Sequence, residues 1–590
     1  MQRLGRERAM RILLVSPEYP DSRLKFTKKE VRAFWFPRLS CVTIAALTPP
    51  EHEVVFIDEA VDEVPLDEDF DVVGISVMTA MAHRAYDIAD HFRARGAKVV
   101  LGGMHPTALP EEGLQHADAV VIGEAEELWD PLLQDAARGA VKPIYRADRF
   151  PPMENIPIPR RELFQPGAYM TTNCVQATRG CPYGCDFCTV TEFFGGKFRL
   201  RPIDKIVREV ESLPGKFVVF VDDNITGHRK YAKELFKALS PLNKKWGSQT
   251  TLNMADDAEL LDLAAASGCS SMFVGLETIN EGNLKSVNKY FNKVNKYREQ
   301  FQKFHDHGIM MNTGIIFGFD GDHEGVFEKT VDFLERNQIE LAQFSVLTPL
   351  PGTRQLEGMM ADGRLTTLDW RRYDGVHCVF RPKQMTPEVL EEGCYWAWQT
   401  YYSVPSIVRR ILKPGEKLLE MAANMYFNWA YRRMVNRLPK GALTPLAKIF
   451  EQMQADIASS AKRRNGEEQE GVRGLRLELS RNYLRFQDTI ELHLAGVLDE
   501  STAYPLRDRI DMLVKKTRGD LLLHFSGLAG VAPKAVQLLV DSTRNAFIAQ
   551  RSRFILQDVD ASLHAWLRQT SIPSYVSIVE AASEAMGTGD

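Results

Sequence analysis

The sequence predicts an α/β protein built from several domains. Short runs rich in Val, Ile and Leu alternate with stretches of helical spacing along most of the chain, and this alternation is typical of parallel sheets covered by helices on both faces. The chain has 590 residues, whereas a single hydrophobic core stops growing at roughly 250–300 residues. We therefore expect about three or four domains, each with its own core.

Residues 10–145 are predicted to form a doubly wound domain with a parallel sheet. A helix is expected over 80–96, where helical spacing ends at a glycine. The apolar runs are followed by Ser, Gly or Pro, which mark the carboxyl ends of the expected strands. Open α/β sheets bind ligands beyond these carboxyl ends, so we expect a ligand site there. The expected strands are 11–17, 52–60, 71–79, 98–106 and 117–126.

Strand and helix signals alternate again over residues 171–360. The preceding segment, 146–170, is rich in Pro and lacks periodicity, so we expect an ordered linker there. The alternation predicts a partial (β/α) barrel, whose site would lie at the carboxyl ends of its strands. The expected strands are 217–224, 246–253, 271–278, 310–319 and 341–353, and the expected helices include 256–268 and 324–338.

The last third of the chain changes character twice. Residues 361–455 are helical in spacing and interleave aromatic residues with arginine, so we expect a helical substrate or cap region. Residues 456–474 are highly charged, without apolar periodicity, and are typical of a linker. Residues 475–590 alternate strand and helix signals once more and predict a small α/β domain.

Composition excludes several classes of protein. The formal net charge is -5, which lacks the basic field of a nucleic-acid binder. No apolar run approaches the roughly 20 residues of a membrane-spanning helix. The apolar stretch after Met10 is too short for a signal peptide, so we expect a strand there, with Met10 as a candidate start after a disordered lead. We expect a cytoplasmic protein, at most peripheral to the inner face of the membrane.

Three of the eight cysteines are crowded into one short segment. Cys181, Cys185 and Cys188 form a CxxxCxxC pattern, which in a large intracellular chain indicates metal or redox chemistry. Zinc sites usually have four ligands in paired CxxC knuckles, and here only Cys174 lies nearby in sequence. Three thiolates leave one iron of a cubane cluster without a protein ligand. We therefore expect a 4Fe-4S cluster on these three residues.

This segment resembles the signature of the radical S-adenosylmethionine (SAM) superfamily, in which an aromatic residue precedes the last cysteine. Phe187 stands at that position. Other stretches that resemble the family follow in its order: VDDN at 221–224, GLET at 275–278, GIIFGF at 314–319 and PLPGT at 349–353.

The resemblance implies where SAM binds and what reaction follows. An electron from the reduced cluster would cleave SAM, and the resulting 5′-deoxyadenosyl radical would abstract hydrogen from an unactivated carbon. A flavodoxin or ferredoxin type of protein would supply the electron. The resemblance places the SAM contacts at Phe187, Asp222, Asp223, Glu277, Gly314 and Gly318.

The first domain resembles the cobalamin-binding domain of cobalamin-dependent radical SAM enzymes. The resemblance rests on LGGMHPTALPEEG at 101–113 and DAVVIGEAE at 118–126. The DxHxxG signature of cobalamin mutases is missing, so we do not expect His105 to bind cobalt. Some members of the family keep this domain without using cobalamin, which leaves that alternative open. Candidate cobalamin contacts are Ser16, Ser76, Gly102, Gly103, Gly123 and Glu124.

The two remaining regions resemble known modules. Residues 365–455 resemble the carboxy-terminal domain of hopanoid methylases, mostly through the stretch 394–410. Arg409, Arg410, Arg432 and Arg433 with nearby aromatics would suit a membrane interface. Packing over the barrel mouth is the alternative. Residues 475–590 resemble STAS domains, named after sulfate transporters and anti-sigma-factor antagonists. Their phosphorylated serine turn reads APKA here, so we expect a partner-binding or dimerisation module.

These observations predict a radical SAM enzyme, with cobalamin-dependent C-methylation of a hydrophobic substrate as the favoured reaction. A polycyclic lipid or a tetrapyrrole is the expected substrate class, and nucleic acid is not an expected partner. Radical cyclisation or carbon–carbon coupling without methyl transfer is the enzymatic alternative. A cobalamin-binding or partner-binding scaffold is the non-enzymatic alternative.

Overall fold

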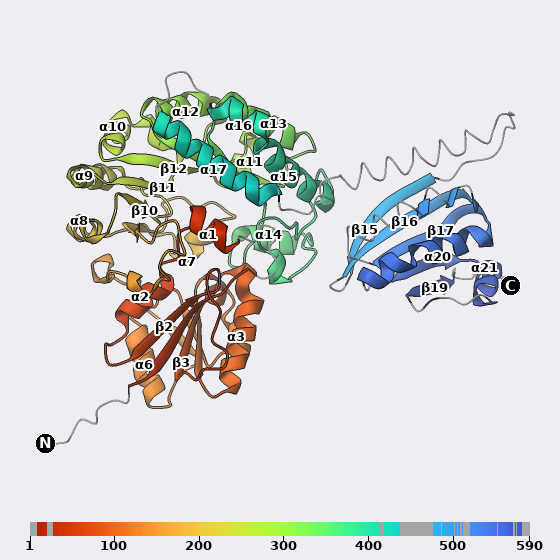
Figure 1. Ribbon diagram of the computed structural model, residues 1–590, viewed down its shortest axis with the longest axis horizontal. Coiled ribbons are helices and arrows are strands. Elements are labelled where there is room, and N and C mark those ends of the chain that lie inside the picture. Colours follow the sequence, from red (N-terminus) through yellow and green to blue (C-terminus); the bar gives the residue numbers. More distant parts are fainter. Residues whose placement is uncertain are drawn as a thin grey trace, which may run out of the picture. The chain divides into compact units, whose positions relative to one another are not determined.

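The computed structural model divides the chain into two compact units, Met1–Leu438 and Pro439–Asp590 (Figure 1). The predicted charged linker at 456–474 lies outside the described residues, as does the end of the helical region beyond 436. The structure describes residues 9–19, 27–411, 418–436, 476–484, 487–500, 502–503, 506–507, 510, 520–550, 553–569, 573 and 575–580.

The first domain is built on a six-stranded sheet, ordered β2-β1-β3-β4-β5-β6, in which all paired strands are parallel. Each expected strand is present. The sixth strand, β6, crosses the expected domain boundary at 145, and its three residues are too few to show an apolar run. The strands are β1 (Arg11–Ser16), β2 (Glu53–Asp58), β3 (Val72–Ser76), β4 (Lys98–Gly102), β5 (Ala119–Ile122) and β6 (Ile144–Arg146).

Helices cover both faces of this sheet (Figure 1). One face packs on α3 and the other on α2 and α6, and each face has its own cluster of buried apolar side chains. This two-sided burial explains why the strands are apolar throughout. The helices are α2 (Ser40–Leu47), α3 (Ala82–Ala94), α4 (Met104–Ala108), α5 (Pro110–His116) and α6 (Trp129–Ala137).

The segment 146–170 is ordered by contacts with both domains. Tyr169 donates a hydrogen bond to Asp58 Oδ2 at 2.9 Å, at the end of β2. Arg161 forms a buried ion pair with Glu209 in the helix α8 (Ile203–Ser212) and also donates to the carbonyl of Cys174. The segment therefore runs along the boundary between the first domain and the second.

The second domain is an open, partial (β/α) barrel. Its parallel sheet has the order β14-β13-β12-β11-β10-β7. A short antiparallel pair, β8 (Thr178–Arg179) and β9 (Arg199–Leu200), flanks the cysteine segment. The sheet strands are β7 (Cys174–Val175), β10 (Phe217–Phe220), β11 (Lys245–Thr250), β12 (Cys269–Glu277), β13 (Met310–Phe317) and β14 (Leu341–Val346).

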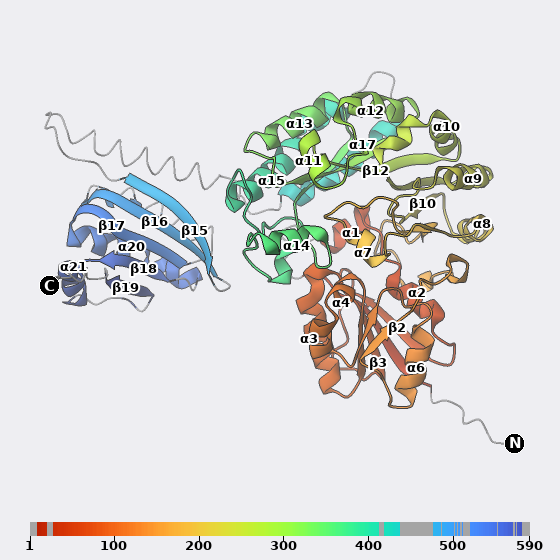
Figure 2. The same ribbon diagram turned by 180° about the vertical axis from the view of Figure 1, so that it is seen from behind.

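Helices follow the barrel strands and lie on the outside of the sheet (Figure 2). The expected helices at 256–268 and 324–338 correspond to α10 and α13. The helices are α7 (Thr189–Phe193), α8 (Ile203–Ser212), α9 (Arg229–Leu239), α10 (Ala258–Ala266), α11 (Glu281–Ser286), α12 (Tyr297–Asp306), α13 (Val326–Arg336) and α14 (Arg354–Ala361).

Three further helices, α15 (Pro387–Tyr401), α16 (Val404–Ile411) and α17 (Leu418–Asn436), complete the first unit. The α15 helix packs on the edge strand β14, and α17 packs beside α1 (Lys28–Phe34) of the first domain. Arg410 is completely buried and donates to main-chain carbonyls of the barrel. The expectation that Arg410 faces a membrane is therefore wrong. No described helix is long and apolar enough to cross a membrane.

The second unit has a five-stranded sheet ordered β15-β16-β17-β18-β19, in which only the β15–β16 pair is antiparallel. Its helices bury one face of the sheet over a separate apolar core. The resemblance to STAS domains stays a prediction. The elements are β15 (Arg476–Leu484), β16 (Gln487–Leu498), β17 (Asp520–Val531), α20 (Pro533–Gln550), β18 (Phe554–Val559), α21 (Ala561–Gln569) and β19 (Val576–Glu580).

Candidate active site

The three clustered cysteines lie on one loop between β8 and the short helix α7. Cys181, Cys185 and Cys188 are half-buried free thiols, and the other five cysteines are buried in other parts of the fold. The Asn224 side-chain amide donates to Cys181 Sγ at 3.8 Å. Three accessible soft ligands on one loop, without a fourth accessible cysteine, fit a cluster with one open iron.

The protonation of these thiols depends on burial. Burial raises the pKa of Cys185 to about 12 and that of Cys188 to about 11, and in both cases the Lys289 ammonium acts in the opposite direction. Without metal the thiols are therefore protonated at neutral pH. Metal binding must release these protons, because the thiolate is the ligand form.

Two adjacent carboxylates follow β10, and the structure separates their roles. Asp222 is completely buried and accepts hydrogen bonds from the Ala177 amide at 3.2 Å and from the Thr178 hydroxyl at 2.6 Å. Burial raises its pKa to about 7. Asp223 is half-buried, accepts from the Gly180 amide at 3.2 Å, and has its pKa raised to about 6 by burial. Asp222 thus holds the strand before the cysteine loop, which leaves Asp223 as the stronger SAM candidate.

Glu277 ends β12 in an unusual backbone conformation. Its φ is 64°, and the β12–β13 register shifts between Gly275 and Glu277. Its carboxylate pairs with the buried Lys289 ammonium. Burial alone would lower the pKa of Lys289, but the charge of the Glu277 carboxylate raises it. No short motif pointed to Lys289, which places a fixed positive charge beside the cysteine loop.

The proposed SAM contact Gly318 lies in a turn close to the aromatic residue of the cysteine signature. Gly318 has φ of 105°, and a Cβ there would stand 2.7 Å from Leu390 Cδ2. The Asp322 carboxylate accepts from the Gly318 amide at 2.9 Å and from the next amide at 3.1 Å, which shapes this turn. The Phe187 and Phe319 rings meet edge to face at 6.3 Å. Asp322 had no signal in the sequence.

The carboxyl edge of the first sheet holds the proposed cobalamin contacts. The strand order reverses between β1 and β3, and ligands of doubly wound sheets bind at such a switch point. Ser16 ends β1 and accepts from Arg38 at 2.9 Å, and Ser76 ends β3 and donates to Ser40 at 3.1 Å. The polar ends of both strands therefore meet at the expected crevice.

Glycines shape the backbone at this edge, and Gly123 has open space beside its Cα. Gly103 has φ of 100°, and a Cβ there would stand 2.8 Å from the Val77 carbonyl. Gly123 has φ of 80°, and its amide donates to Thr107 Oγ1 at 3.0 Å, while Gly102 ends β4. His105 is completely buried, and its ring nitrogens contact Tyr86 and other polar side chains. Such an edge fits cobalamin bound without a histidine ligand.

Glu124 has a different environment from the other proposed cobalamin contacts. It is buried and pairs with Arg179 at 3.2 Å and with Arg199, both from the strands that flank the cysteine loop. Arg179 also pairs with Glu126 at 2.6 Å. We name these four residues the domain-bridging network. The network ties the cobalamin-binding side of the first domain to the start of the cysteine loop.

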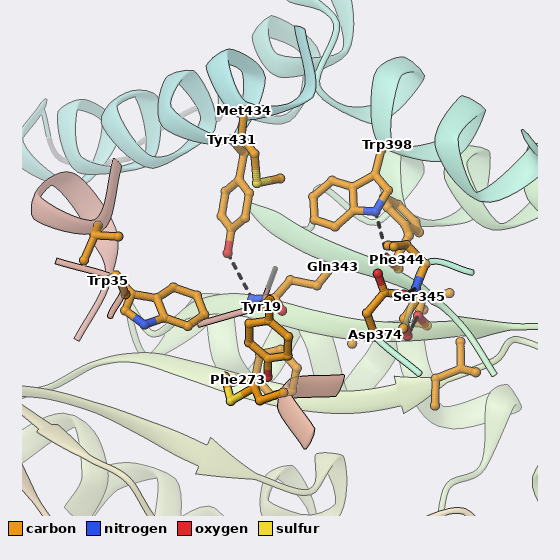
Figure 3. A pocket seen from close by; sticks show the side chains of 18 of the residues that line it. Tyr19, Trp35, Phe273, Gln343, Phe344, Ser345, Asp374, Trp398, Tyr431 and Met434 are labelled. Atoms are coloured by element: carbon orange, nitrogen blue, oxygen red, sulfur yellow. Dashed lines mark hydrogen bonds between the residues drawn. The ribbon is translucent and has the colours of Figure 1, made fainter. Parts of the chain in front are cut away.

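A cavity of about 400 Å³ lies between the carboxyl edge of the first sheet and the barrel strands. The first domain contributes Tyr19 after β1 and Trp35 after α1, and Glu277 and Gly314 line the barrel side. Figure 3 shows the aromatic side chains around it and the hydrogen bond from Gln343 to the Tyr431 hydroxyl, at 3.0 Å. The aromatic and apolar lining includes Trp35, Phe273, Phe344, Trp398, Tyr431 and Met434.

Comparison with known proteins identifies both domains of the first unit. The profile of the radical SAM superfamily matches residues 175–334, and that of the B12 binding domain matches residues 38–132. Bacteriochlorophyllide d C-12(1)-methyltransferase of Chlorobaculum tepidum is 37% identical over 385 residues, which are 63% of this chain and 84% of that protein. The chain belongs to the radical SAM superfamily.

Two further proteins are similar to this chain. Hopanoid C-2 methylase of Rhodopseudomonas palustris (strain TIE-1) is 31% identical, over 61% of this chain and 72% of that protein. The solved radical SAM methyltransferase TsrM of Kitasatospora setae, with cobalamin and a [4Fe-4S] cluster bound, has a TM-score of 0.53 and 15% identity, over 73% of this chain and 99% of that one. The latter similarity concerns the fold alone.

The resemblance of the first domain to cobalamin-binding domains and that of the second to the radical SAM superfamily are therefore confirmed. The predicted α/β fold class is confirmed as well. The protein is an enzyme of the cobalamin-dependent C-methyltransferase family, so the non-enzymatic scaffold alternative is wrong. Its cofactors are a 4Fe-4S cluster, SAM and cobalamin. A small-molecule substrate and an electron donor complete the reaction.

Proposed function

We propose that this radical SAM enzyme methylates a carbon of a large, mostly apolar ring system that carries an acidic group. The aromatic cavity carries this proposal, because it lies between the proposed cobalamin edge and the proposed SAM contacts. Two similar proteins are named for methylating a bacteriochlorophyllide and a hopanoid. A flat, apolar ring system would bury well against the aromatic lining.

The acidic group is inferred from the charges around the cavity. Arg38 is the only cation among the residues that line this described cavity. Its guanidinium donates to Ser16 and lies 5.7 Å above the Tyr19 ring, so its side chain is held in place. The cavity is also lined by the carboxylates of Glu18, Glu277 and Asp374, so the fixed Arg38 guanidinium is the lining group that suits a substrate carboxylate. This favours a tetrapyrrole acid over a neutral polycyclic lipid.

Each cofactor has proposed contacts in the chain. We assign the cluster to Cys181, Cys185 and Cys188, and we assign cobalamin to the carboxyl edge of the first sheet. When bound, the cofactors supply hydrogen abstraction at an unreactive carbon and a methyl group to place there. The chain's own contribution is to hold the substrate and to exclude water from the cavity. The proposed SAM contacts are Phe187, Asp223, Glu277, Gly314 and Gly318.

The reaction type is tested by the products formed from SAM. In anaerobic turnover of the reconstituted enzyme, methylation consumes two SAM molecules and releases S-adenosylhomocysteine and 5′-deoxyadenosine together with the methylated product. Equal amounts of the two nucleosides are the expected result. Release of 5′-deoxyadenosine without S-adenosylhomocysteine would contradict methyl transfer and favour cyclisation or coupling.

The substrate class is tested with Arg38→Met. We expect the KM for a tetrapyrrole carboxylic acid to rise about 10-fold or more, because a charge-assisted hydrogen bond is lost, while the KM for its methyl ester stays unchanged. Arg32→Met is the matched control, because Arg32 is exposed on α1. Bound cobalamin is measured in each variant. Equal losses with the acid and the ester would contradict the proposed contact.

The route of the substrate to the cavity is also proposed. Trp35 lines the cavity and is partly exposed, and the neighbouring α17 exposes Met425, Tyr426 and Trp429 on one face. Arg433 is exposed one turn further along this face. Apolar residues next to an arginine suit the interface of an anionic membrane. We propose that the enzyme takes its substrate from a membrane surface at this face, and that a flavodoxin or ferredoxin type of protein supplies electrons.

A further inference from the structure

The second unit presents a compact group of histidines and carboxylates on one face of its sheet. Side chains alternate between faces along a strand, and Leu492 and Leu494 of β16 and Leu523 of β17 lie in the apolar core. Glu491, His493 and His524 therefore lie on the opposite face. His493 and His524 are direct neighbours in the β16–β17 register.

The side chains in this group approach one another closely. Glu491 Oε2 lies 3.8 Å from His493 Nε2 and 3.7 Å from His524 Nε2. The two imidazole rings stack at 4.0 Å between centroids with an interplanar angle of 10°. One potential ligand atom from each residue lies within 4.8 Å of the other two.

A second carboxylate orients one of the histidines. Asp558 Oδ2 lies 3.3 Å from His524 Nδ1, so that His524 Nε2 is directed toward Glu491. This Nε2 atom is buried and has no hydrogen-bond partner within the described part of the chain. Asp558 has φ of 60°, the left-handed conformation that few residues other than glycine adopt. Histidines that bind metals usually donate their other ring nitrogen to a carboxylate in this way.

We propose that Glu491, His493 and His524 bind a divalent transition-metal ion of the zinc type, with Asp558 as a positioning residue. Zinc binds imidazole nitrogen and carboxylate oxygen at about 2.0–2.2 Å, so tetrahedral ligand atoms stand roughly 3.4 Å apart. The separations of 3.7 and 3.8 Å need to close by a few tenths of an ångström, with a tilt of one ring out of the stack. Three protein ligands leave a fourth position for water or another ligand.

This inference does not depend on the radical chemistry, and its test avoids the cluster. The full chain carrying Cys181→Ala, Cys185→Ala and Cys188→Ala is dialysed against buffered Zn²⁺, so that the loop thiols cannot compete. We expect one Zn²⁺ per chain. His493→Gln or His524→Gln should weaken binding by about 100-fold or more, and Asp558→Asn by roughly 10–100-fold. Asp541→Asn, on the exposed side of α20, is the control and should leave binding unchanged.

A second measurement separates ligand loss from misfolding. Cu²⁺ bound to the same protein should show nitrogen splitting from two imidazoles in electron paramagnetic resonance, and each single histidine variant should show one. Circular dichroism of the metal-free variants checks that the second unit remains folded. The proposal is overturned if Zn²⁺ does not bind, or if binding survives His493→Gln and His524→Gln together.

Discussion

At the scale of single residues, several carboxylates of the site hold backbone in place. Asp222 accepts from the strand before the cysteine loop, and Asp322 accepts from the turn at Gly318. The VDDN motif located a pair of carboxylates but could not separate their roles. The role of each carboxylate depends on the groups that it contacts in the folded chain, and these groups are distant in sequence. Asp322 and Lys289 had no sequence signal for the same reason.

The cysteine assignment is tested by iron content. Anaerobically reconstituted Cys181→Ala, Cys185→Ala and Cys188→Ala should each lose the cluster, because each would remove one of its three proposed ligands. Cys174→Ala should keep it, because Cys174 is completely buried in β7. Iron, sulfide and the visible absorbance are measured for each protein. Loss of the cluster in Cys174→Ala alone would contradict the assignment.

The Asp322 carboxyl should make stability depend on pH. Burial raises its pKa from 3.8 to about 6, so the folded state retains a proton that the unfolded state has lost. The stabilisation is complete below about pH 4 and is lost as the pH rises through about 6, on the order of 1–3 kcal/mol. Relative to Asp322→Asn, the wild type should therefore become less stable over this range. Urea unfolding at a series of pH values measures this difference.

Asp320 is the matched control for this titration. Partial burial raises its pKa, but ion pairs with Lys383 and Arg364 outweigh burial and lower it. Its contribution should therefore be lost as the pH falls, so the difference between wild type and Asp320→Asn should change in the opposite direction. The same pH trend in both variants would contradict the assignment to Asp322.

At the scale of elements, the sequence predicted what depends on local pattern. Five strands of each sheet in the first unit and the helices α3, α10 and α13 follow from apolar periodicity, and glycines mark the ends of α3 and α10. The short strands β6, β7, β8 and β9 carry no such pattern, because two or three residues cannot show a period. The packing of α1 on α17 was also unpredictable, since it joins segments that are about 390 residues apart.

Arg410 stabilises the contact of α15, α16 and α17 with β14. Its guanidinium donates to the Tyr401 carbonyl at 2.7 Å and to Asn428 Oδ1 at 2.9 Å, in addition to its contacts with Ile339 and Glu340. Arg410→Met should lower the free energy of unfolding by about 3–5 kcal/mol, because buried acceptors lose their donor.

The neighbouring residue offers the control for this change. Arg409 is exposed and pairs with Glu335 at 2.9 Å on the surface, so Arg409→Met should cost about 0–1 kcal/mol. Urea unfolding followed by circular dichroism measures both variants. Equal losses would contradict the structural role of Arg410.

At the scale of the whole molecule, the proposed membrane face is tested by liposome flotation. The full chain should float with vesicles that contain anionic lipid, because apolar burial and charge attraction add at this face. Met425→Gln combined with Trp429→Gln should reduce flotation about 10-fold. Ile158→Gln is the control, because Ile158 is at least as exposed as Met425 and Trp429 but lies in the linker segment. Flotation that survives the double substitution would contradict this face.

The domain-bridging network has a consequence for how the first unit unfolds. Its charges are almost completely buried: Arg179 is 8% exposed and Glu124 is 7% exposed. If the first domain opened alone, Arg179 and Arg199 would lose their carboxylate partners, and removing one partner of a buried pair costs about 3–5 kcal/mol. Partly melted states are thereby penalised, so the two domains should denature in a single cooperative transition. The cobalamin-binding domain then stabilises the folded conformation of the cysteine loop, which is the loop that binds the cluster.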